Sequence, residues 1–409
     1  MTQRNPNLAK LHATYLFAEI ARRKQQFLQE NPDARLISLG IGDTTSPIPQ
    51  HIVEGFHHAA TCLGDEATYT GYEEAFGRFE LRKRIANKLY HSMVEAEEVY
   101  ISDGSKCDIA RLQLLFGTDA SVAVQDPSYP AYVGSSVIAG KTGSFNPDTE
   151  QYEKIVYMAC TKENGFFPDL STTPRADIIY FCSPNNPTGE TPTRQQLEEL
   201  VAFTKKNRSI LIFDTAYSTF IQDSDSVHSI YEIEGAREVA IETSSFSKMI
   251  GFTGVRLGWT VVPKELRYDD GTAVADDWKR ILSTCFNGAS NIAQIGGIAA
   301  LDPEGIEASR HLINAYMENA KVLREAVELK GYTCYGGVHA PYIWVDLNGK
   351  KSWDAFDEFL YDAHIVSTPG AGFGPSGEGF LRLSAFGKKE DIQEAAKRIK
   401  TVLQEKVSS

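Results

Sequence analysis

Short apolar runs alternate with amphipathic segments through the middle of the chain. Three such runs occupy residues 122–126, 177–182 and 210–214. Near-continuous apolar runs are typical of strands that are buried on both faces of a sheet. The segments between them carry helix signals, for example Thr193 and Gln196 at the spacing of a capping box. This alternation predicts an α/β fold whose mostly parallel sheet has helices on both faces.

The pattern changes after Pro263, where helical periodicity dominates to about residue 330. Strands and helices then mix, and the N-terminal arm carries a helix of its own. The expected elements are strands at 342–347, 364–367 and 380–384 and helices at 16–30, 352–361 and from 390 onward. They predict a smaller α+β domain. We expect a large domain over 46–295, beginning with a helix capped by Ser46, and a discontinuous small domain formed by 1–45 and 296–409.

Polar motifs follow the predicted strands of the large domain. Tyr129 follows the first strand, Asn186 follows the second, and Asp214 ends the third with Tyr217 close behind. A turn at Gly104–Ser105 precedes a predicted helix, and the free N–H groups of a helix start bind anions. Ligands of parallel α/β sheets bind beyond the carboxyl ends of the strands. The motifs therefore predict one shared site.

The most informative stretch is residues 244–251, where Lys248 lies among serines and between two strand-like runs. A lysine packed between strands costs stability unless it has a function. A desolvated amine loses its proton readily and becomes nucleophilic. Ser245, Ser247 and Arg256 suit a phosphate close by. Together they predict pyridoxal phosphate bound to Lys248 as a Schiff base. The alternatives are a surface lysine and a structural ion pair for Arg256.

Other side chains fit roles around that cofactor. Asp214 would face the pyridine nitrogen and keep it protonated, while Tyr217 and Asn186 would donate hydrogen bonds to the phenolate oxygen. Tyr129 would stack on the ring. Arg382 would grip a substrate carboxylate with its planar guanidinium. The structural alternatives are a turn or cap for Asp214 and Asn186, a core aromatic for Tyr129, and an ion pair for Arg382.

Composition narrows the class of protein. The chain has 409 residues and a net charge of −13, with no basic run, which argues against a nucleic-acid partner. Its 6 cysteines are scattered, without a CxxC pair or a nearby histidine cluster, so we expect neither a disulfide framework nor a metal site. No stretch resembles a signal peptide or a membrane span. We expect a cytoplasmic protein that acts on small molecules.

These motifs, in this order, resemble the fold-type I aminotransferases of class I/II. The carriers are residues 183–189, Asp214 with Tyr217, residues 245–248, and Arg256, and the resemblance covers essentially the whole chain. It implies a pyridoxal-phosphate-dependent transferase with a mostly parallel central sheet flanked by helices and a smaller α+β domain. It also implies a homodimer with shared active sites, in which Tyr72 reaches the partner's phosphate. The remaining phosphate contacts that it implies are Gly104, Ser105, Lys106, Ser245 and Ser247.

A narrower resemblance is to the LL-diaminopimelate aminotransferase family. Its carriers are residues 5–6, 15–17, 39–45, 101–106, 125–132, 216–221, 246–248, 256–260, 285–291 and 339–342. That family transfers an amino group between LL-diaminopimelate and 2-oxoglutarate, which gives tetrahydrodipicolinate and glutamate in lysine biosynthesis. The substrate contacts that it implies are Tyr15, Gly42, Lys106, Tyr129, Asn186, Arg382 and, from the partner chain, Asn287.

The loop after Tyr72 departs from this narrower pattern. Some members carry a glutamate there that helps to hold the distal ammonium of the substrate. The matching position in this chain is Ala75, and Glu73 and Glu74 are the candidates to substitute for that glutamate.

Three alternative functions are consistent with part of the sequence. The nearest is another enzyme on the same scaffold, an aromatic or glutamate aminotransferase or a β-elimination lyase. A non-catalytic cofactor-binding regulator is disfavoured because the chain has no basic extension for DNA. A nucleotide-binding α/β protein is disfavoured because no G-x-G-x-x-G turn follows the first strand.

Overall fold

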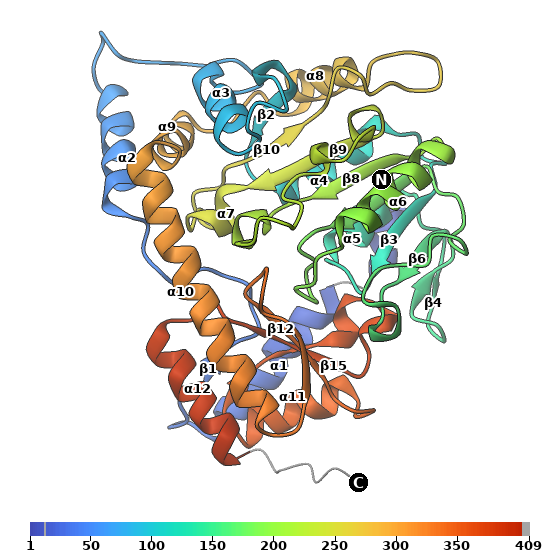
Figure 1. Cartoon of the computed structure of the whole chain (residues 1–409), viewed down its shortest axis with the longest axis vertical. Coiled ribbons are helices and arrows are strands. Elements are labelled where there is room, and N and C mark those ends of the chain that lie inside the picture. The colour runs from blue at the N-terminus through green and yellow to red at the C-terminus, as the bar shows by residue number, and fades with distance from the viewer. Residues whose placement is uncertain (12–13, 403–409) are drawn as a thin grey trace.

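The computed structural model of the chain describes residues 1–11 and 14–402, apart from the side chains of residues 14, 15, 17 and 402. A seven-stranded sheet forms the centre of the larger part of the molecule (Figure 1). Its order is β2 (Val99–Ser102), β10 (Gly258–Val261), β9 (Ala240–Ser245), β8 (Ile210–Asp214), β7 (Ile178–Cys182), β3 (Val122–Asp126) and β6 (Ile155–Ala159). Strand β10 is antiparallel to both of its neighbours, while β9, β8, β7, β3 and β6 pair in parallel.

Each central strand contributes alternate side chains to two separate cores. In β8, Ile210 and Ile212 belong to one core, whereas Leu211 and Phe213 belong to the other. The core that contains Ile210 and Ile212 is covered by three helices, α4 (Ser105–Leu112), α5 (Ala131–Ile138) and α8 (Val274–Cys285). The other core is covered by α3 (Phe79–Lys88), α6 (Arg194–Lys206) and α9 (Asn291–Ala300). Helix α2 (Gln50–Cys62) packs on α9. Burial on both faces explains the continuous apolar runs in the sequence.

A second, smaller sheet lies below the first in Figure 1. It is antiparallel, in the order β11 (Thr333–Gly336), β12 (Tyr342–Asp346), β15 (Phe380–Ser384) and β14 (Thr368–Pro369). Helices α1 (Thr14–Glu30), α11 (Ser352–Tyr361) and α12 (Lys389–Val402) lie around it. Strand β1 (Ile37–Ser38) pairs in parallel with β13 (Ile365–Val366), which joins the N-terminal segment to the C-terminal part of the chain. The long helix α10 (Pro303–Glu328) runs from the large sheet to the small one.

Most expected elements are confirmed, and one expected helix start is wrong. The capping box of Thr193 and Gln196 opens α6, and the helix predicted at 352–361 is α11. The first helix of the large domain begins at Gln50, after Pro49, and not at Ser46–Pro47. A residue that precedes proline is disfavoured in the α conformation, so Pro49 keeps Ile48 out of the helix. The expected strand at 364–367 is shortened to β13, and strands β6, β11, β14, β4 (Phe145–Asn146) and β5 (Gln151–Tyr152) were not predicted.

The boundaries of the two domains, at 45/46 and 295/296, stay a prediction. No helix within residues 1–11 and 14–402 combines the length and apolarity needed to cross a bilayer. All 6 cysteines are free thiols. Among the described residues, no group of three or more histidine, cysteine, aspartate or glutamate side chains is arranged to hold a metal ion.

Candidate active site

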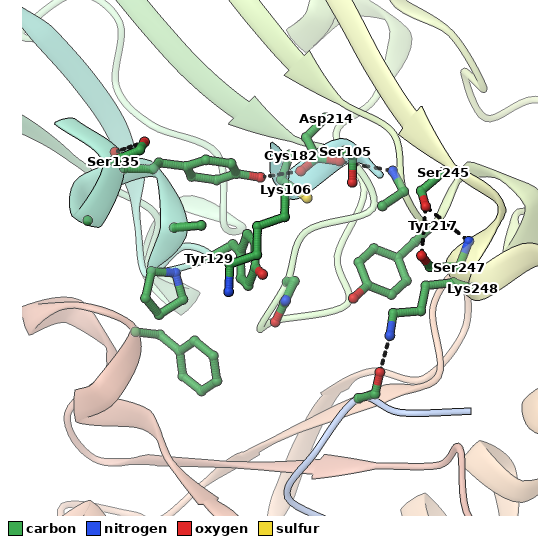
Figure 2. Close-up of a pocket in the computed structure, with 18 of the residues that line it drawn as sticks. Ser105, Lys106, Tyr129, Ser135, Cys182, Asp214, Tyr217, Ser245, Ser247 and Lys248 are labelled. Carbon is green, nitrogen blue, oxygen red and sulfur yellow. Dashed lines mark hydrogen bonds between the residues drawn. The ribbon is translucent and has the colours of Figure 1, made fainter. Parts of the chain in front are cut away.

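A cavity of about 710 Å³ lies between the carboxyl edge of the large sheet and the small sheet. Its wall brings together most of the predicted site residues, as Figure 2 shows for those on the large sheet. The predicted residues that line it are Gly42, Ser105, Lys106, Tyr129, Asn186, Asp214, Tyr217, Ser245, Ser247, Lys248, Arg256 and Arg382. They come from the ends of five strands of the large sheet and the turns after them, from the turn before β10, from the segment after β1, and from β15 of the small sheet. The structure thus brings them together around one cavity, at the sheet edge where ligands of such folds bind.

The antiparallel direction of β10 explains how Arg256 reaches this edge. Gly258, at the start of β10, pairs with Ser245 and with Ser102, the last residues of β9 and β2. The turn before β10 therefore lies beside the turns that follow β2 and β9. Arg256 Nη1 is 3.4 Å from Ser247 Oγ, to which it donates.

The turns around Arg256 form an anion cradle. Helix α4 begins at Ser105, and the amides of a helical first turn have no partner inside the helix. Gly104 has φ = 119°, and a Cβ there would overlap the Arg256 guanidinium. Ser245 Oγ donates to Ser247 Oγ at 2.8 Å and accepts from the Ser247 amide at 3.0 Å. Hydroxyls, helix-start amides and one arginine thus converge, which is the donor set that a phosphate requires.

The Lys248 amine projects into the cavity from α7 (Phe246–Met249), the short helix that follows β9 (Figure 2). It donates a hydrogen bond to the backbone carbonyl of Gly42, in the segment after β1. Burial lowers the pKa of Lys248 to about 8, and the positive charges of Arg382 and Arg256 act in the same direction. About a tenth of this amine is therefore uncharged at pH 7, far more than for an ordinary lysine of pKa about 10.4, and the uncharged form is the one that nucleophilic or base catalysis requires.

Asp214 lies at the floor of the cavity, at the end of β8. Its Oδ2 accepts a 2.8 Å hydrogen bond from Tyr132 Oη, and its Oδ1 accepts from the Ala216 amide at 3.1 Å. Burial raises the pKa of Asp214 to about 6. A buried carboxylate without a paired charge favours a cation placed against it. Asp214 is therefore suited to hold a proton on a nitrogen of a bound molecule.

Arg382, in β15, is buried without a carboxylate partner among the described residues. Its side chain is only 3% exposed. The guanidinium donates to Asn186 Oδ1 at 2.7 Å and to the Gly40 carbonyl at 2.6 Å, and its Nε has no partner. A buried cation that is paired only with neutral oxygens is costly. An anionic ligand in the cavity would offset that cost, so the ion-pair alternative for Arg382 is not supported.

Two aromatic side chains and a lysine complete the wall that is predicted to meet the ring of the cofactor. Tyr217 Oη lies 2.8 Å from Tyr342 Oη. Tyr129 packs edge-on against Tyr132, with 5.7 Å between the ring centroids, and Lys106 Nζ lies 6.0 Å from the Tyr129 centroid. Burial raises the pKa of Tyr129 to about 12.

Tyr72 and Asn287 lie outside this cavity. Both line a second hollow of about 460 Å³ beside the N-terminus of α9, and Tyr72 is 92% exposed. The resemblance assigns both to the partner's site, and their distance from this chain's own cavity is consistent with that assignment. Glu73 and Glu74 line the same hollow, where Glu73 pairs with Arg78 and Glu74 pairs with Arg82. The Tyr15 side chain lies outside the part of the structure that is described.

Sequence reasoning missed two tyrosines that contact the predicted residues. Tyr132 bonds to Asp214, and Tyr342 bonds to Tyr217. The first is separated from its partner by 82 positions and the second by 125. Tyr132 has one local signal: it follows Tyr129 by three residues at the start of a helix, where such neighbours lie on one face.

The fold and this site define an aminotransferase. Residues 34–399 match the sequence model of the family described as aminotransferase class I and II, and the chain belongs to this family. A curated relative from Protochlamydia amoebophila (strain UWE25), named LL-diaminopimelate aminotransferase, is 56% identical over 403 residues, which cover 98% of this chain and 98% of the relative.

A plant relative and a solved structure extend this likeness. The Arabidopsis thaliana protein named LL-diaminopimelate aminotransferase, chloroplastic, is 56% identical over 398 residues, or 97% of this chain and 86% of the relative. The solved structure of L,L-diaminopimelate aminotransferase from Chlamydomonas reinhardtii superposes with a TM-score of 0.93 at 55% identity, covering 98% of both chains. The predicted fold class is therefore confirmed.

Proposed function

We propose that this chain is an LL-diaminopimelate aminotransferase of lysine biosynthesis. It would exchange an amino group reversibly between LL-2,6-diaminopimelate and 2-oxoglutarate, giving tetrahydrodipicolinate, glutamate and water. The observation that carries the proposal is that one cavity holds both an amine of lowered pKa, Lys248, and a buried arginine without a carboxylate partner, Arg382. The full-length likeness to three proteins of that name supports this choice of substrate.

The residues present fit pyridoxal 5′-phosphate. The amides at Ser105, the hydroxyls of Ser245 and Ser247 and the guanidinium of Arg256 would hold its phosphate. Asp214 would meet its ring nitrogen, and Tyr217 with Asn186 would meet its phenolate oxygen. Tyr129 would lie against the ring, and Lys248 would be the point of covalent attachment. When bound, this group supplies an electron-withdrawing ring that makes the Cα proton of an amino acid acidic.

Lys248 is the residue that moves the proton. Its uncharged Nζ would take the proton from Cα of the amino acid substrate in the first half-reaction. In the second half-reaction it would return a proton to Cα of the amino acid product. The Gly42 carbonyl, which accepts a hydrogen bond from Nζ, would hold the amine in the cavity whenever it is not attached to the cofactor. Asp214 stays ionised opposite the ring nitrogen. The two half-reactions use the same lysine, so we expect ping-pong kinetics.

Arg382 would orient the substrate by its α-carboxylate. The guanidinium is already held in one plane by Asn186 and Gly40, so little conformational entropy remains to be lost when a carboxylate binds. Lys106, Gly42, Tyr15 and the partner's Asn287 would contact the rest of diaminopimelate. The oxo acid that forms then closes on its own second amine with loss of water.

We propose further that the active form is a homodimer. Tyr72 and Asn287 lie together on the outside of the chain, and each would complete the site of the other subunit. Because Glu73 and Glu74 are each paired with an arginine of their own chain, we propose that neither is the main ligand of the distal ammonium.

The direct test of substrate class is product analysis. The holoenzyme is incubated with 2-oxoglutarate and, in separate reactions, LL-diaminopimelate, meso-diaminopimelate, phenylalanine or aspartate. We expect glutamate and the cyclic imine to form in equal amounts from LL-diaminopimelate. Glutamate formed only from phenylalanine or aspartate would identify a different aminotransferase, and release of ammonia without glutamate would identify a lyase.

A further inference from the structure

Asp126, the last residue of β3, is a buried carboxylate that is bonded to the small-sheet part of the molecule. It is 2% exposed. The Ser376 amide donates to its Oδ1 and Oδ2 at 3.2 and 3.1 Å, and Ser376 Oγ donates to Oδ2 at 2.8 Å. Among the described residues no cation pairs with it, and burial raises its pKa to about 6. The ionised Asp126 carboxylate holds the segment around Ser376 firmly, because hydrogen bonds to charged groups are about twice as strong as neutral ones.

Ser376 belongs to a compact turn between β14 and β15. The turn comprises two short 3-10 helices, η8 (Gly370–Phe373) and η9 (Pro375–Gly377). The Gly377 amide donates to the Gly374 carbonyl at 2.9 Å, which folds the turn on itself. Gly374 has φ = 130°, and a Cβ there would overlap the Asp126 carboxylate. The turn is therefore shaped to admit this carboxylate.

The same turn places Phe373 against the substrate arginine. The centroid of the Phe373 ring lies 4.7 Å from Arg382 Cζ, and that of the Tyr342 ring lies 4.5 Å from the same atom. Phe373 is tied to the large sheet by its carbonyl, which accepts from the Ser128 amide at 2.9 Å. Asp126 and Ser128 thus hold both ends of the short segment from Phe373 to Ser376.

The two rings have a physical effect on Arg382. Stacked rings exclude water from the faces of the guanidinium, and charge interactions strengthen when water is excluded. Asn186 and Gly40 hold the arginine in place by hydrogen bonds, whereas the two rings lie over its guanidinium. A shift of the 370–377 turn would leave Arg382 where it is and expose one face of it to solvent.

We propose that Asp126 is a positioning residue for carboxylate recognition: through Ser376 it sets the 370–377 turn, and thereby Phe373, over the guanidinium that binds the substrate carboxylate. This inference rests on the proposed function in one respect, that Arg382 binds a carboxylate. It does not depend on which amino acid is the substrate. The competing interpretation is that the Asp126–Ser376 contact only holds the two sheets together.

Two substitutions separate these interpretations. Ser376→Ala removes the hydroxyl donor, and Asp126→Asn removes the charge. The matched control is Ser171→Ala: Ser171 donates to Asp169 Oδ1 from its amide at 2.9 Å and from its hydroxyl at 2.6 Å, in an exposed turn that does not line the cavity. The probe is glutarate, an unreactive dicarboxylate, whose dissociation constant for each holoenzyme is measured by calorimetry. Amide hydrogen exchange of residues 370–377 is followed in parallel.

We expect Ser376→Ala and Asp126→Asn to weaken glutarate binding, the latter by roughly tenfold. We also expect faster exchange in the 370–377 turn, a raised KM for 2-oxoglutarate and an unchanged kcat. Ser171→Ala should change none of these. A lowered melting temperature in Ser376→Ala with unchanged glutarate affinity would overturn the proposal. If Asp126→Asn does not fold, the glutarate affinity of Ser376→Ala alone decides between the two interpretations. Failure of the proposed function would appear separately, as wild-type enzyme that binds glutarate but does not use LL-diaminopimelate.

Discussion

The phenol of Tyr132 donates a 2.8 Å hydrogen bond to Oδ2 of Asp214, although 82 positions separate the two residues. Tyr132 is completely buried and stacks on Tyr180, with 5.0 Å between the centroids and 12° between the ring planes. The phenol therefore cannot turn away from the carboxylate without disturbing the core. Its donated proton favours the ionised form of Asp214, whereas burial favours the neutral form.

Tyr132→Phe should therefore raise the pKa of Asp214 further and reduce the fraction that is ionised at neutral pH. We expect kcat/KM for amino transfer to fall by roughly tenfold, because a hydrogen bond to a charged group contributes about 1.5–3 kcal/mol. Steady-state kinetics of the purified variant measure the change. Tyr180→Phe is the control, since it removes a buried hydroxyl that accepts from Gln113 at 2.7 Å and does not touch Asp214. Equal losses in both variants would refute a specific role for Tyr132.

The lowered pKa of Lys248 predicts how the cofactor-free enzyme takes up pyridoxal phosphate. Only an uncharged amine attacks the aldehyde, and burial lowers the pKa of this amine to about 8. The uptake rate should rise with pH and level off above about pH 8, whereas an ordinary lysine would continue to rise to about pH 10. Stopped-flow absorbance at a series of pH values gives the midpoint, with Nα-acetyl-lysine as the reference amine. A midpoint near that of the reference amine would show that Lys248 is solvated.

Gly104→Ala should weaken cofactor binding. The new methyl group would overlap the Arg256 guanidinium, and φ = 119° is a conformation that side chains rarely adopt. Displacing Arg256 removes one charge-assisted contact to phosphate, so we expect the affinity for pyridoxal phosphate to fall by roughly tenfold or more. Equilibrium dialysis measures it. Gly117→Ala is the matched control, because a Cβ there meets nothing within 4 Å. Undiminished affinity in Gly104→Ala would contradict the assignment of the phosphate cradle.

Shared active sites predict complementation between inactive subunits. Lys248→Ala should bind the cofactor without turnover, and Tyr72→Ala should lose activity because each partner site lacks its tyrosine. A hybrid dimer contains one site with both changes and one site with neither. Co-expression of the two chains with different tags should therefore restore about a quarter of wild-type activity in a random mixture. Activity of Lys248→Ala alone, or no recovery in isolated hybrids, would contradict the arrangement.

Local sequence signals were sufficient for the central sheet and for the residues at its edge. Strands β3, β7 and β8 are buried on both faces, so their apolar runs are distinctive, and the parallel arrangement places Tyr129, Asn186 and Asp214 at one edge. The edge strand β6 was missed although its residues are all apolar, and only Ile155 and Met158 of it are buried.

Contacts between distant segments could not be predicted in the same way. The Tyr132–Asp214 and Asp126–Ser376 hydrogen bonds join residues 82 and 250 positions apart, and no local pattern encodes such a pairing. The position of Arg256 depended on the direction of β10, which becomes clear only when Gly258 is seen opposite Ser102 and Ser245. Chemistry at strand ends was therefore predictable, whereas the partners that tune it required the fold.

The most direct test of the central claim is the half-reaction. Holoenzyme is mixed with LL-diaminopimelate and, in separate experiments, with meso-diaminopimelate, glutamate, aspartate and phenylalanine, and the absorbance of the enzyme-bound cofactor is followed in the stopped flow. We predict rapid bleaching with LL-diaminopimelate and glutamate only. Bleaching with phenylalanine or aspartate but not with LL-diaminopimelate would still identify the protein as an aminotransferase, but it would contradict the assignment of diaminopimelate as its substrate.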